Sequence, residues 1–379
     1  MMDRIAQDCL ELMYGAGSQF RDGQLDAIKS VVNGKKTLVV QRTGWGKSTV
    51  YFIATRILRD KGYGVSILIS PLLSLMRNQI ESASKLGIVA ETINSSNQGE
   101  WDTIKERLSN NEIDILLISP ERLGNQEFVG SFMPLINKGI GLFVVDEAHC
   151  ISDWGHDFRP DYQRIVNIIN TLPSNVPVLA TTATANNRVV KDIKKQLGES
   201  LVILRGSLLR ESLNLQIIEF SSQAERMAWL SEHINGIDGS GIIYCSTKGD
   251  CNRVAGWLRE CGIDALEYHS SLSSDNEINT SLRSSRESKL MNNEVKALVS
   301  TVALGMGFDK PDLAFVIHYQ RPGSIVSYYQ QIGRAGRALD DAIVVLLTGK
   351  EDEEIQEYFI ESAFPTSIEM NSVVKVIES

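Results

Sequence analysis

The chain has 379 residues, a length that predicts about two to three domains and excludes a single small module. Hydrophobic residues make up 43% and charged residues 22%, with 29 Gly and 9 Pro, which excludes a disordered or collagen-like chain. The 38 Lys and Arg against 47 Asp and Glu give a net charge of -9. Any nucleic-acid partner must therefore be held by a local basic groove, because the surface as a whole is acidic.

The cysteines are few and show no CxxC pair: Cys9, Cys150, Cys245, Cys251 and Cys261. Neither a disulfide framework nor a closed zinc site is indicated, and a reducing compartment fits best. The sequence has no targeting signal and no run of about 18 apolar residues. We expect a soluble intracellular protein without membrane contact, cytoplasmic and nucleoid-associated if bacterial and nuclear if eukaryotic.

Short apolar runs rich in β-branched residues alternate with amphipathic stretches of helical length. The first series consists of TLVVQ (37–41), VSILISP (65–71), DILLISP (114–120), GLFVVDE (141–147) and PVLATTA (177–183). A second series consists of LQIIEF (215–220), GIIYC (241–245), ALEYH (265–269), ALVST (297–301), FVIHY (315–319) and AIVVLL (342–347). This rhythm predicts two tandem α/β domains, each with a parallel sheet covered by helices on both faces.

The segment GSLLRESLN (206–214) lies between the two series and is interpreted as a hinge. We expect an N-terminal domain over residues 1–207, a second domain over 208–348 and a helical extension over 349–379 that opens with EDEEIQEYF. The serine-rich stretch 270–288 is interpreted as a solvated connection, either a loop or an exposed helix. No third α/β unit follows, so we expect the sequence to be a fragment of a longer protein or a natural two-domain form.

The stretch QRTGWGKST (41–49) follows an apolar strand and precedes a helical pattern, which is typical of a phosphate-binding loop. Its glycines, Gly44 and Gly46, allow backbone N–H groups to surround phosphate oxygens, while Lys47 supplies a positive charge and Ser48 a ligand for Mg²⁺. Thr43 and Thr49 complete the candidate binding residues. The alternative is a tight strand-to-helix turn with a solvated lysine.

A later strand ends in VVDEAH, which places two carboxylates and a histidine at the carboxyl edge of the same predicted sheet. Asp146 is the candidate ligand of Mg²⁺, and Glu147 is the candidate group that orients the attacking water. His149 is interpreted as a residue that couples this pair to another part of the protein. An isolated Asp-Glu pair at a strand end could equally be a cap or a surface pair.

Eight motifs, read together and in order, resemble those of the RecQ family of superfamily 2 DNA helicases over about residues 10 to 348. They are FRDGQ (20–24), QRTGWGKS (41–48), SPLLSLMRNQ (70–79), VVDEAHCISDWGHDFRPDYQRI (144–165), TTATA (181–185), GIIYCSTK (241–248), VSTVALGMGFDKPD (299–312) and YYQQIGRAGRA (328–338). The resemblance implies two RecA-like lobes with ATP and Mg²⁺ in the cleft between them. It also implies movement along DNA in the 3′-to-5′ direction.

Specific residues take roles from this resemblance. Gln24 would hydrogen-bond the adenine edge with Arg21 beside the base, which selects ATP over GTP. Gln330, Arg334 and Arg337 would form the arginine-finger motif, and Asp309 would contact the ribose.

The DNA path is also predicted from the resemblance. The aromatic and basic loop after the DEAH motif would stack on unpaired bases and transmit DNA occupancy to Glu147; its residues are Trp154, His156, Phe158 and Arg159. Further contacts and coupling residues are predicted at Ser74, Arg77, Asn78, His149, Thr182, Ser246, Lys248 and Thr301. Contacts of this kind position a strand without reading its bases, so no sequence preference is expected. The expected substrates are single-stranded and tailed duplex DNA.

The chain departs from the family in the phosphate loop, with Arg42 where Pro is usual and Trp45 where Gly is usual. The bulk of an indole beside the phosphates puts the affinity for ATP in question. The family's aromatic residue before FRxxQ is displaced, and Tyr14, next to Gly15 and Gly17, is the nearest candidate to cover adenine.

No cysteine follows Cys261, so the four-cysteine zinc module of many relatives is absent and we expect no structural zinc and no ordinary strand-separating wedge. Two functions remain open. The first is a DNA-dependent ATPase and 3′-to-5′ helicase, and the second is a module that translocates or remodels DNA without unwinding it. The second function would belong to a larger repair or defence assembly, with a partner protein or a missing C-terminal domain.

Overall fold

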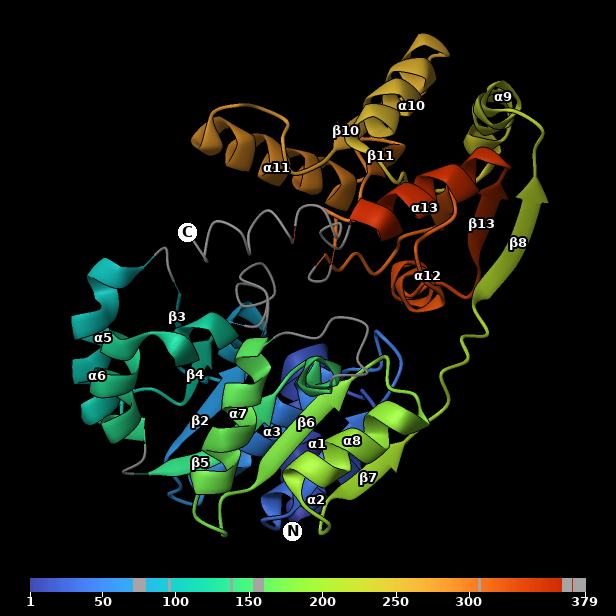
Figure 1. Cartoon of the computed structure of the whole chain (residues 1–379). Helices are drawn as coiled ribbons and strands as arrows, with labels where there is room; N and C mark the ends of the chain where they lie inside the picture. Colours follow the sequence, from blue (N-terminus) through green and yellow to red (C-terminus); the bar gives the residue numbers. More distant parts are fainter. Residues whose placement is uncertain are drawn as a thin grey trace, which may run out of the picture. The chain divides into compact units, whose positions relative to one another are not determined.

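The structure is a computed structural model that describes residues 1–70, 80–94, 97–136, 139–152, 160–305, 308–362 and 370. The chain folds into two compact units (Figure 1). Met1–Leu209 belongs to the first unit, and the second unit begins at Arg210.

The first unit contains a sheet whose described strands all pair in parallel, in the order β3-β4-β2-β5-β6-β1-β7. The strands are β1 (Lys36–Val40), β2 (Val65–Ile69), β3 (Ala90–Ile93), β4 (Ile115–Ile118), β5 (Ile140–Val145), β6 (Val178–Thr182) and β7 (Val202–Arg205). Because β1, β2, β4, β5 and β6 have neighbours on both edges and helices on both faces, their sequences read as nearly unbroken apolar runs.

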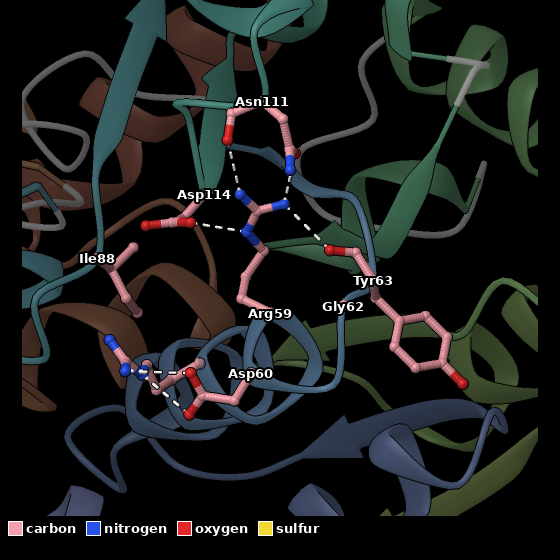
Figure 2. Close-up of a pocket in the computed structure, with 8 residues that line it drawn as sticks. Arg59, Asp60, Gly62, Tyr63, Ile88, Asn111 and Asp114 are labelled. Carbon is pink, nitrogen blue, oxygen red and sulfur yellow. Dashed lines mark hydrogen bonds and ion pairs between the residues drawn. The ribbon is translucent and has the colours of Figure 1, made fainter.

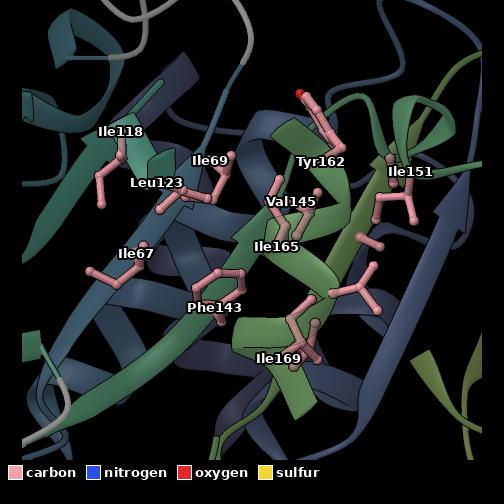
Figure 3. Packing of buried hydrophobic residues seen from close by; sticks show 14 of the residues in the cluster. Ile67, Ile69, Ile118, Leu123, Phe143, Val145, Ile151, Tyr162, Ile165 and Ile169 are labelled. Atoms are coloured by element: carbon pink, nitrogen blue, oxygen red, sulfur yellow. The ribbon is translucent and has the colours of Figure 1, made fainter. Parts of the chain in front are cut away.

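Helices cover both faces of this sheet (Figure 1). The buried cluster on one face includes residues from α1 (Met2–Tyr14), α2 (Gln24–Val32) and α3 (Lys47–Asp60). The cluster on the other face includes residues from α5 (Trp101–Ser109), α6 (Gln126–Ile136), α7 (Pro160–Thr171) and α8 (Asn187–Leu197). Figure 3 shows part of the second cluster, where Ile165 and Ile169 of α7 lie beside Phe143 of β5.

The second unit contains a sheet in the order β10-β11-β9-β12-β13-β8, again with parallel pairs throughout the described strands. The strands are β8 (Leu213–Glu219), β9 (Gly241–Tyr244), β10 (Ala265–Tyr268), β11 (Ala297–Ser300), β12 (Phe315–His318) and β13 (Ala342–Thr348). The helices are α9 (Gln223–His233), α10 (Lys248–Glu260), α11 (Asn276–Met291), α12 (Ile325–Ile332) and α13 (Glu351–Ser362). Short 3-10 helices occur at Gln98–Glu100, Pro120–Gly124, Ala148–Ile151 and Ile234–Gly236.

Polar residues fix several helix starts at the points that the sequence marks. Asn186, Ser222, Thr247, Asp275 and Ser324 each precede a helix and accept hydrogen bonds from backbone N–H groups of its first turn. These groups have no partner inside the helix, so the side-chain oxygen stabilises the helix terminus.

The predicted fold class, two tandem RecA-like α/β domains, is confirmed, and every predicted apolar run contributes to a strand. Two edge strands, β3 and β7, were not predicted. Each has only four residues and is partly exposed; β3 (AETI) mixes polar with apolar residues, whereas β7 (VILR) is an apolar run that was not assigned to a strand. The serine-rich stretch 270–288 lies mostly in α11, whose exposed surface leaves only Leu290 buried. Among the described helices, none has the length and apolar character that crossing a bilayer requires.

Candidate functional site

The first candidate site lies where β1, β5 and β6 end. These three strands are neighbours in a parallel sheet, so their carboxyl ends meet at one edge. The loop after β1 carries Lys47, the segment after β5 carries Asp146 and Glu147, and β6 ends at Thr182. Ligands of open α/β sheets bind at such an edge.

The phosphate loop is shaped by two glycines in the left-handed region, Gly44 at φ 78° and Gly46 at φ 93°. The φ of Gly46 strains any other residue, and a Cβ atom there would lie 2.5 Å from Nε2 of Gln24, which would have to move. Lys47, the first residue of α3, donates from Nζ to the carbonyl of Gln41 at 3.3 Å. The loop therefore directs backbone N–H groups and a lysine to the amino end of a helix, an arrangement that favours anions.

The carboxylates after β5 are crowded. Asp146 is 7% exposed, and its Oδ1 accepts a hydrogen bond from Thr181 Oγ1 at 2.6 Å. Burial, reinforced by the charge of Glu147, raises the pKa of Asp146 to about 6, although Thr181 and Lys47 act in the opposite direction. Two carboxylates held this way favour a bound cation, because a cation offsets both their desolvation and their mutual repulsion.

Glu147 has φ 51° and ψ 47°, a left-handed conformation that is uncommon for a residue other than glycine. Its Oε2 lies 3.2 Å from Nδ1 of the fully buried His149, and the same ring nitrogen lies 3.0 Å from Oγ1 of Thr182. His149 therefore contacts both the DEAH segment and the end of β6. A shift at the end of either strand would therefore change the position of the Glu147 carboxylate.

The segment Phe20–Gln24 packs directly against the phosphate loop. Gln24 donates from Nε2 to the carbonyl of Trp45 at 2.8 Å, and its Oε1 accepts from the backbone N–H of Arg21 at 2.8 Å. The Arg21 guanidinium donates to the carbonyl of Gly44. Gln24 Nε2 and the Arg21 guanidinium thus contact the loop, while Gln24 and Arg21 also bond to each other.

Three residues that depart from the family pattern also have defined positions. The Trp45 indole is 5% exposed and belongs to the buried cluster with Ile28 and Tyr51, so its bulk is packed inside the protein. Arg42 donates from Nη1 to the carbonyl of Leu209 at 3.0 Å. The Tyr14 hydroxyl lies 2.8 Å from Thr49 Oγ1, which places this aromatic side chain next to the first turn of α3.

The arginine motif belongs to the second unit. Arg337 Nη1 lies 2.5 Å from Oδ1 of Asp309, so these two predicted site residues form an ion pair. Arg334 is 6% exposed, and Gln330 lies within α12. Burial raises the pKa of the nearby Tyr244 phenol, an effect that the positive charge of Arg334 opposes. Arg334 and Arg337 are therefore held by α12 and the loop that follows it.

Two family models match the chain, a DEAD/DEAH box helicase model over residues 21–193 and a helicase conserved C-terminal domain model over residues 225–339. The probable ATP-dependent DNA helicase RecS of Bacillus subtilis is 33% identical over 376 residues, which cover 98% of this chain and 72% of that protein. The ATP-dependent DNA helicase RecQ of Pasteurella multocida is 36% identical over 340 residues, 89% of this chain and 51% of that protein. The chain belongs to the RecQ family of DNA helicases.

The chain spans about half the length of several RecQ relatives, 51% for the proteins of Pasteurella multocida and Haemophilus influenzae. Solved helicase structures share its fold. The DUF1998 helicase MrfA bound to DNA superimposes with a TM-score of 0.74 at 17% identity, covering 95% of this chain and 53% of that chain. Dbp5 of S. cerevisiae bound to RNA and ADP BeF3 gives 0.69 at 18% identity, covering 94% and 91%.

Two of the loops that the RecQ motifs mark in the second unit follow β9 and β11, which are neighbours in the sheet. After β9, the Ser246 backbone N–H donates to Gln320 Oε1 at 2.8 Å, and Lys248 Nζ donates to Ser271 Oγ at 2.8 Å. After β11, Thr301 Oγ1 accepts from the Ala303 N–H at 3.2 Å. Ser246, Lys248 and Thr301 therefore occupy one edge of the second sheet, as parallel strands require.

Two polar residues at this edge, His269 and Ser271, were not identified from the sequence. His269 follows β10, and its Nε2 lies 3.0 Å from Asn252 Oδ1, while its Nδ1 accepts from the Ser271 N–H at 3.3 Å. Ser271 is also the partner of Lys248. His269 could have been identified from the sequence, because the predicted strand ALEYH ends in this histidine.

Seven predicted DNA-contact residues lie outside the described part of the chain: Ser74, Arg77, Asn78, Trp154, His156, Phe158 and Arg159.

The crowded carboxylates after β5 raise the question of a bound metal ion. Within the part of the chain that the structure describes, no group of three or more His, Cys, Asp or Glu side chains could hold a metal ion. If Mg²⁺ binds here, Asp146 and Ser48 are the predicted oxygen ligands, and phosphate oxygens and water usually supply the others. The crowded Asp146 and Glu147 carboxylates fit this cation.

A separate pocket of about 230 Å³ lies near the end of α3 and the start of β4 (Figure 2). Arg59 donates from Nε to Asp114 Oδ1 at 2.7 Å and from Nη1 to Asn111 Oδ1 at 2.7 Å, and Arg56 pairs with Asp60. Its arginines are already engaged by carboxylates and an amide. These arginine contacts connect α3 to the loop before β4. Because both guanidinium groups are already paired, the pocket is not a candidate site for an anion.

Proposed function

We propose that the chain is an ATP-dependent DNA motor of RecQ type that moves 3′-to-5′ along single-stranded DNA and unwinds duplex DNA. The observation that carries the proposal is the cluster at one sheet edge of the phosphate-loop Lys47, the carboxylates of Asp146 and Glu147, and the His149 contact to Thr182. Phosphoryl transfer depends mainly on positioning and charge stabilisation, which these groups can provide.

The first unit would bind the nucleotide. Thr43, Gly44, Gly46 and Thr49 form the loop that receives the phosphates, while Lys47 neutralises charge on them. With Mg²⁺ held by Ser48 and Asp146, the ion would supply charge neutralisation at the phosphates. Glu147 would orient the attacking water and accept its proton, because its carboxylate is fixed by His149.

The second unit would complete the site. Arg334 and Arg337 are planar, permanently charged donors, so either can stabilise the charge that develops on the transferred phosphoryl group. Asp309, paired with Arg337, would contact the ribose and release the arginine when the site forms. Gln330 would join the same motif from α12. The proposed lobes are residues 1–207 and 208–348.

DNA occupancy would reach the catalytic carboxylate through His149. Its ring contacts Thr182 on one side and Glu147 on the other, so a strand that displaces the TTATA segment changes the position of the water-orienting group. Trp154 and Arg159, in the aromatic and basic loop after the DEAH motif, would contact the same DNA strand. Ser246, Lys248 and Thr301 would hold the backbone in the second unit.

Steady-state ATP hydrolysis with and without single-stranded DNA tests the proposal. Single-stranded DNA should stimulate hydrolysis, and Glu147→Gln should lower kcat by at least about 100-fold, the usual contribution of a general base. Thr182→Val should retain basal hydrolysis and lose part of the stimulation by DNA. Glu199→Gln, which alters a carboxylate 86% exposed, is the matched control and should behave as wild type. Hydrolysis that is indifferent to DNA and to Glu147→Gln would refute the motor.

A second candidate is a DNA-stimulated translocase or remodelling module that does not unwind duplex DNA alone. In this candidate the described site hydrolyses ATP in response to DNA, and strand separation requires a partner protein or another domain. A duplex with a 3′ single-stranded tail separates the two functions. ATP consumption with release of the displaced strand supports the helicase, whereas ATP consumption without release supports the translocase.

A further inference from the structure

We propose that Trp45 is a positioning residue that joins the phosphate loop to the segment Arg21–Gln24, so that the two parts of the nucleotide site form one unit and discriminate between bases. The inference rests on the proposed binding of ATP at the loop. It assigns a role to a residue that differs from the glycine expected at this position of the motif.

The indole provides the first connection. Trp45 donates from Nε1 to the carbonyl of Asp22 at 3.1 Å, and the side chain is 5% exposed. The ring also reaches the turn at Gly23, whose φ is 79°; a Cβ atom built there would lie 3.9 Å from Cζ2 of Trp45. The indole therefore fills the space between the loop and the segment and satisfies a carbonyl within it.

The backbone of Trp45 provides the second connection. Its carbonyl accepts from Gln24 Nε2 at 2.8 Å, and its N–H donates to the Arg42 carbonyl at 3.2 Å. The amide of Gln24 also approaches Gly46 so closely that a Cβ atom there would lie 2.5 Å away. The orientation of the Gln24 amide thus depends on where the backbone of Trp45 lies, and the indole fixes that backbone.

This arrangement has a consequence for base recognition. Gln24 Nε2 donates to the Trp45 carbonyl and, at 3.4 Å, to the Gly46 carbonyl, while Oε1 accepts from the Arg21 N–H. The second lone pair of Oε1 and the weakly used amide hydrogen are the capacity that remains for a base. With glycine at position 45 the loop gains conformational freedom, because glycine has the largest backbone entropy and no side chain to pack. The Gln24 amide would then sample several orientations, and the preference between adenine and guanine would fall.

Two substitutions separate packing from hydrogen bonding. Trp45→Gly removes both the ring and its N–H donor, while Trp45→Phe keeps an aromatic ring and removes only the donor. Trp101→Phe is the matched control in the same unit: Trp101 is 2% exposed, and its Nε1 has no hydrogen-bond partner among the described residues. Thermal unfolding of the three variants measures how much stability each change removes.

The assay is displacement of a fluorescent ADP analogue by ADP and by GDP, on the full chain without DNA. Wild type should prefer ADP. Trp45→Gly should reduce the ADP-to-GDP preference by at least about five-fold, the ratio that one net hydrogen bond represents. Trp45→Phe should lie between Trp45→Gly and wild type, and Trp101→Phe should keep the wild-type preference even where it lowers the unfolding temperature.

A double-mutant cycle with Gln24→Ala tests the connection itself. If Trp45 acts through Gln24, the loss of preference in the double variant should equal that of Gln24→Ala alone, because coupled residues are not additive. Additive losses, or a Trp45→Gly protein with the wild-type preference, would overturn the inference. A wild-type protein that fails to bind the fluorescent nucleotide would instead overturn the proposed function, so the two failures are distinguishable.

Discussion

Arg226 offers a sharp test of how the second unit is held together. This arginine of α9 is fully buried, and its Nη1 donates to Asp352 Oδ1 at 2.9 Å and to the Tyr319 carbonyl at 2.7 Å. Its Nη2 lies 2.7 Å from Oε1 of Glu351, and its guanidinium carbon lies 5.5 Å from the centroid of the Tyr319 ring. One buried cation thus connects α9, the segment after β12 and the start of α13.

Replacing Arg226 with Met removes the cation and leaves the 1% exposed Asp352 carboxylate without it. Breaking a buried ion pair from one side costs about 3–5 kcal/mol, because the remaining charge is left desolvated. Asp352 Oδ2 still accepts from the backbone N–H groups of Arg321 at 3.1 Å and Gly349 at 3.3 Å. These bonds stabilise the remaining carboxylate, so we expect a loss near the lower limit, about 3 kcal/mol.

Differential scanning calorimetry of the full chain measures this loss as a fall in the unfolding temperature of the second unit. For a unit of this size, ~3 kcal/mol corresponds to about 6–12 °C. Arg253→Met is the matched control, because Arg253 is 52% exposed and its buried partner Asp250 keeps hydrogen bonds from Thr247 Oγ1 and Gln320 Nε2. Solvent screens an ion pair whose cation is half exposed, and Asp250 keeps its other partners, so the control should shift the transition much less than Arg226→Met.

The reasoning is refuted if Arg226→Met and Arg253→Met lower the transition by the same amount. Equal shifts would mean that burial of the Arg226 cation adds no stability beyond a surface contact. Hydrogen exchange of α9 and α13 provides an independent measurement, because loss of the ion pair should increase exchange in both helices.

Three further predictions concern stability and the nucleotide site. His318 is buried and its pKa is lowered to about 4 from 6.5, because burial disfavours the imidazolium. The unfolded chain therefore binds more protons between these pH values, and stability should fall by about 3 kcal/mol as the pH decreases through this window; urea titrations of His318→Gln should lose this slope. Gly46→Ala should weaken binding of a fluorescent ADP at least about ten-fold, because its Cβ would meet Gln24 in a strained left-handed conformation; unchanged affinity would contradict the geometry of the loop. Asn186→Ala should cost about 1 kcal/mol in urea unfolding, because its side chain caps two backbone N–H groups of α8, whereas the exposed Lys191→Ala should cost much less.

Most of the sheet could be predicted from the sequence because its central strands are buried on both faces. Runs such as ILLI of β4 and FVIH of β12 have no polar alternation, and their spacing leaves room for a helix between them. The edge strands β3 and β7 of the first sheet were not predicted, although the edge strands β8 and β10 of the second sheet were. β3 is only partly buried and its sequence AETI mixes polar with apolar residues, whereas β7 is a four-residue apolar run, VILR, with alternate residues exposed.

The residue types of the candidate site, and their order, were also evident from the sequence. A glycine-rich loop, a DEAH segment and a GRAGR segment each carry a local chemical pattern that survives without knowledge of the fold. Local patterns do not indicate where long side chains point. The Trp45 indole was expected beside the phosphates, but it packs inside the protein and donates to the Asp22 carbonyl.

The sequence by itself determined the fold class, the motif order and the family, since these depend on local composition and spacing. Only the tertiary structure decided which distant residues touch. His149 and Thr182 meet because β5 and β6 are neighbours in the sheet, and Arg226 meets Asp352 although 126 positions separate them. Strand order and helix packing bring such pairs together. Both depend on burial of the whole core, so they cannot be read from any single segment of the sequence.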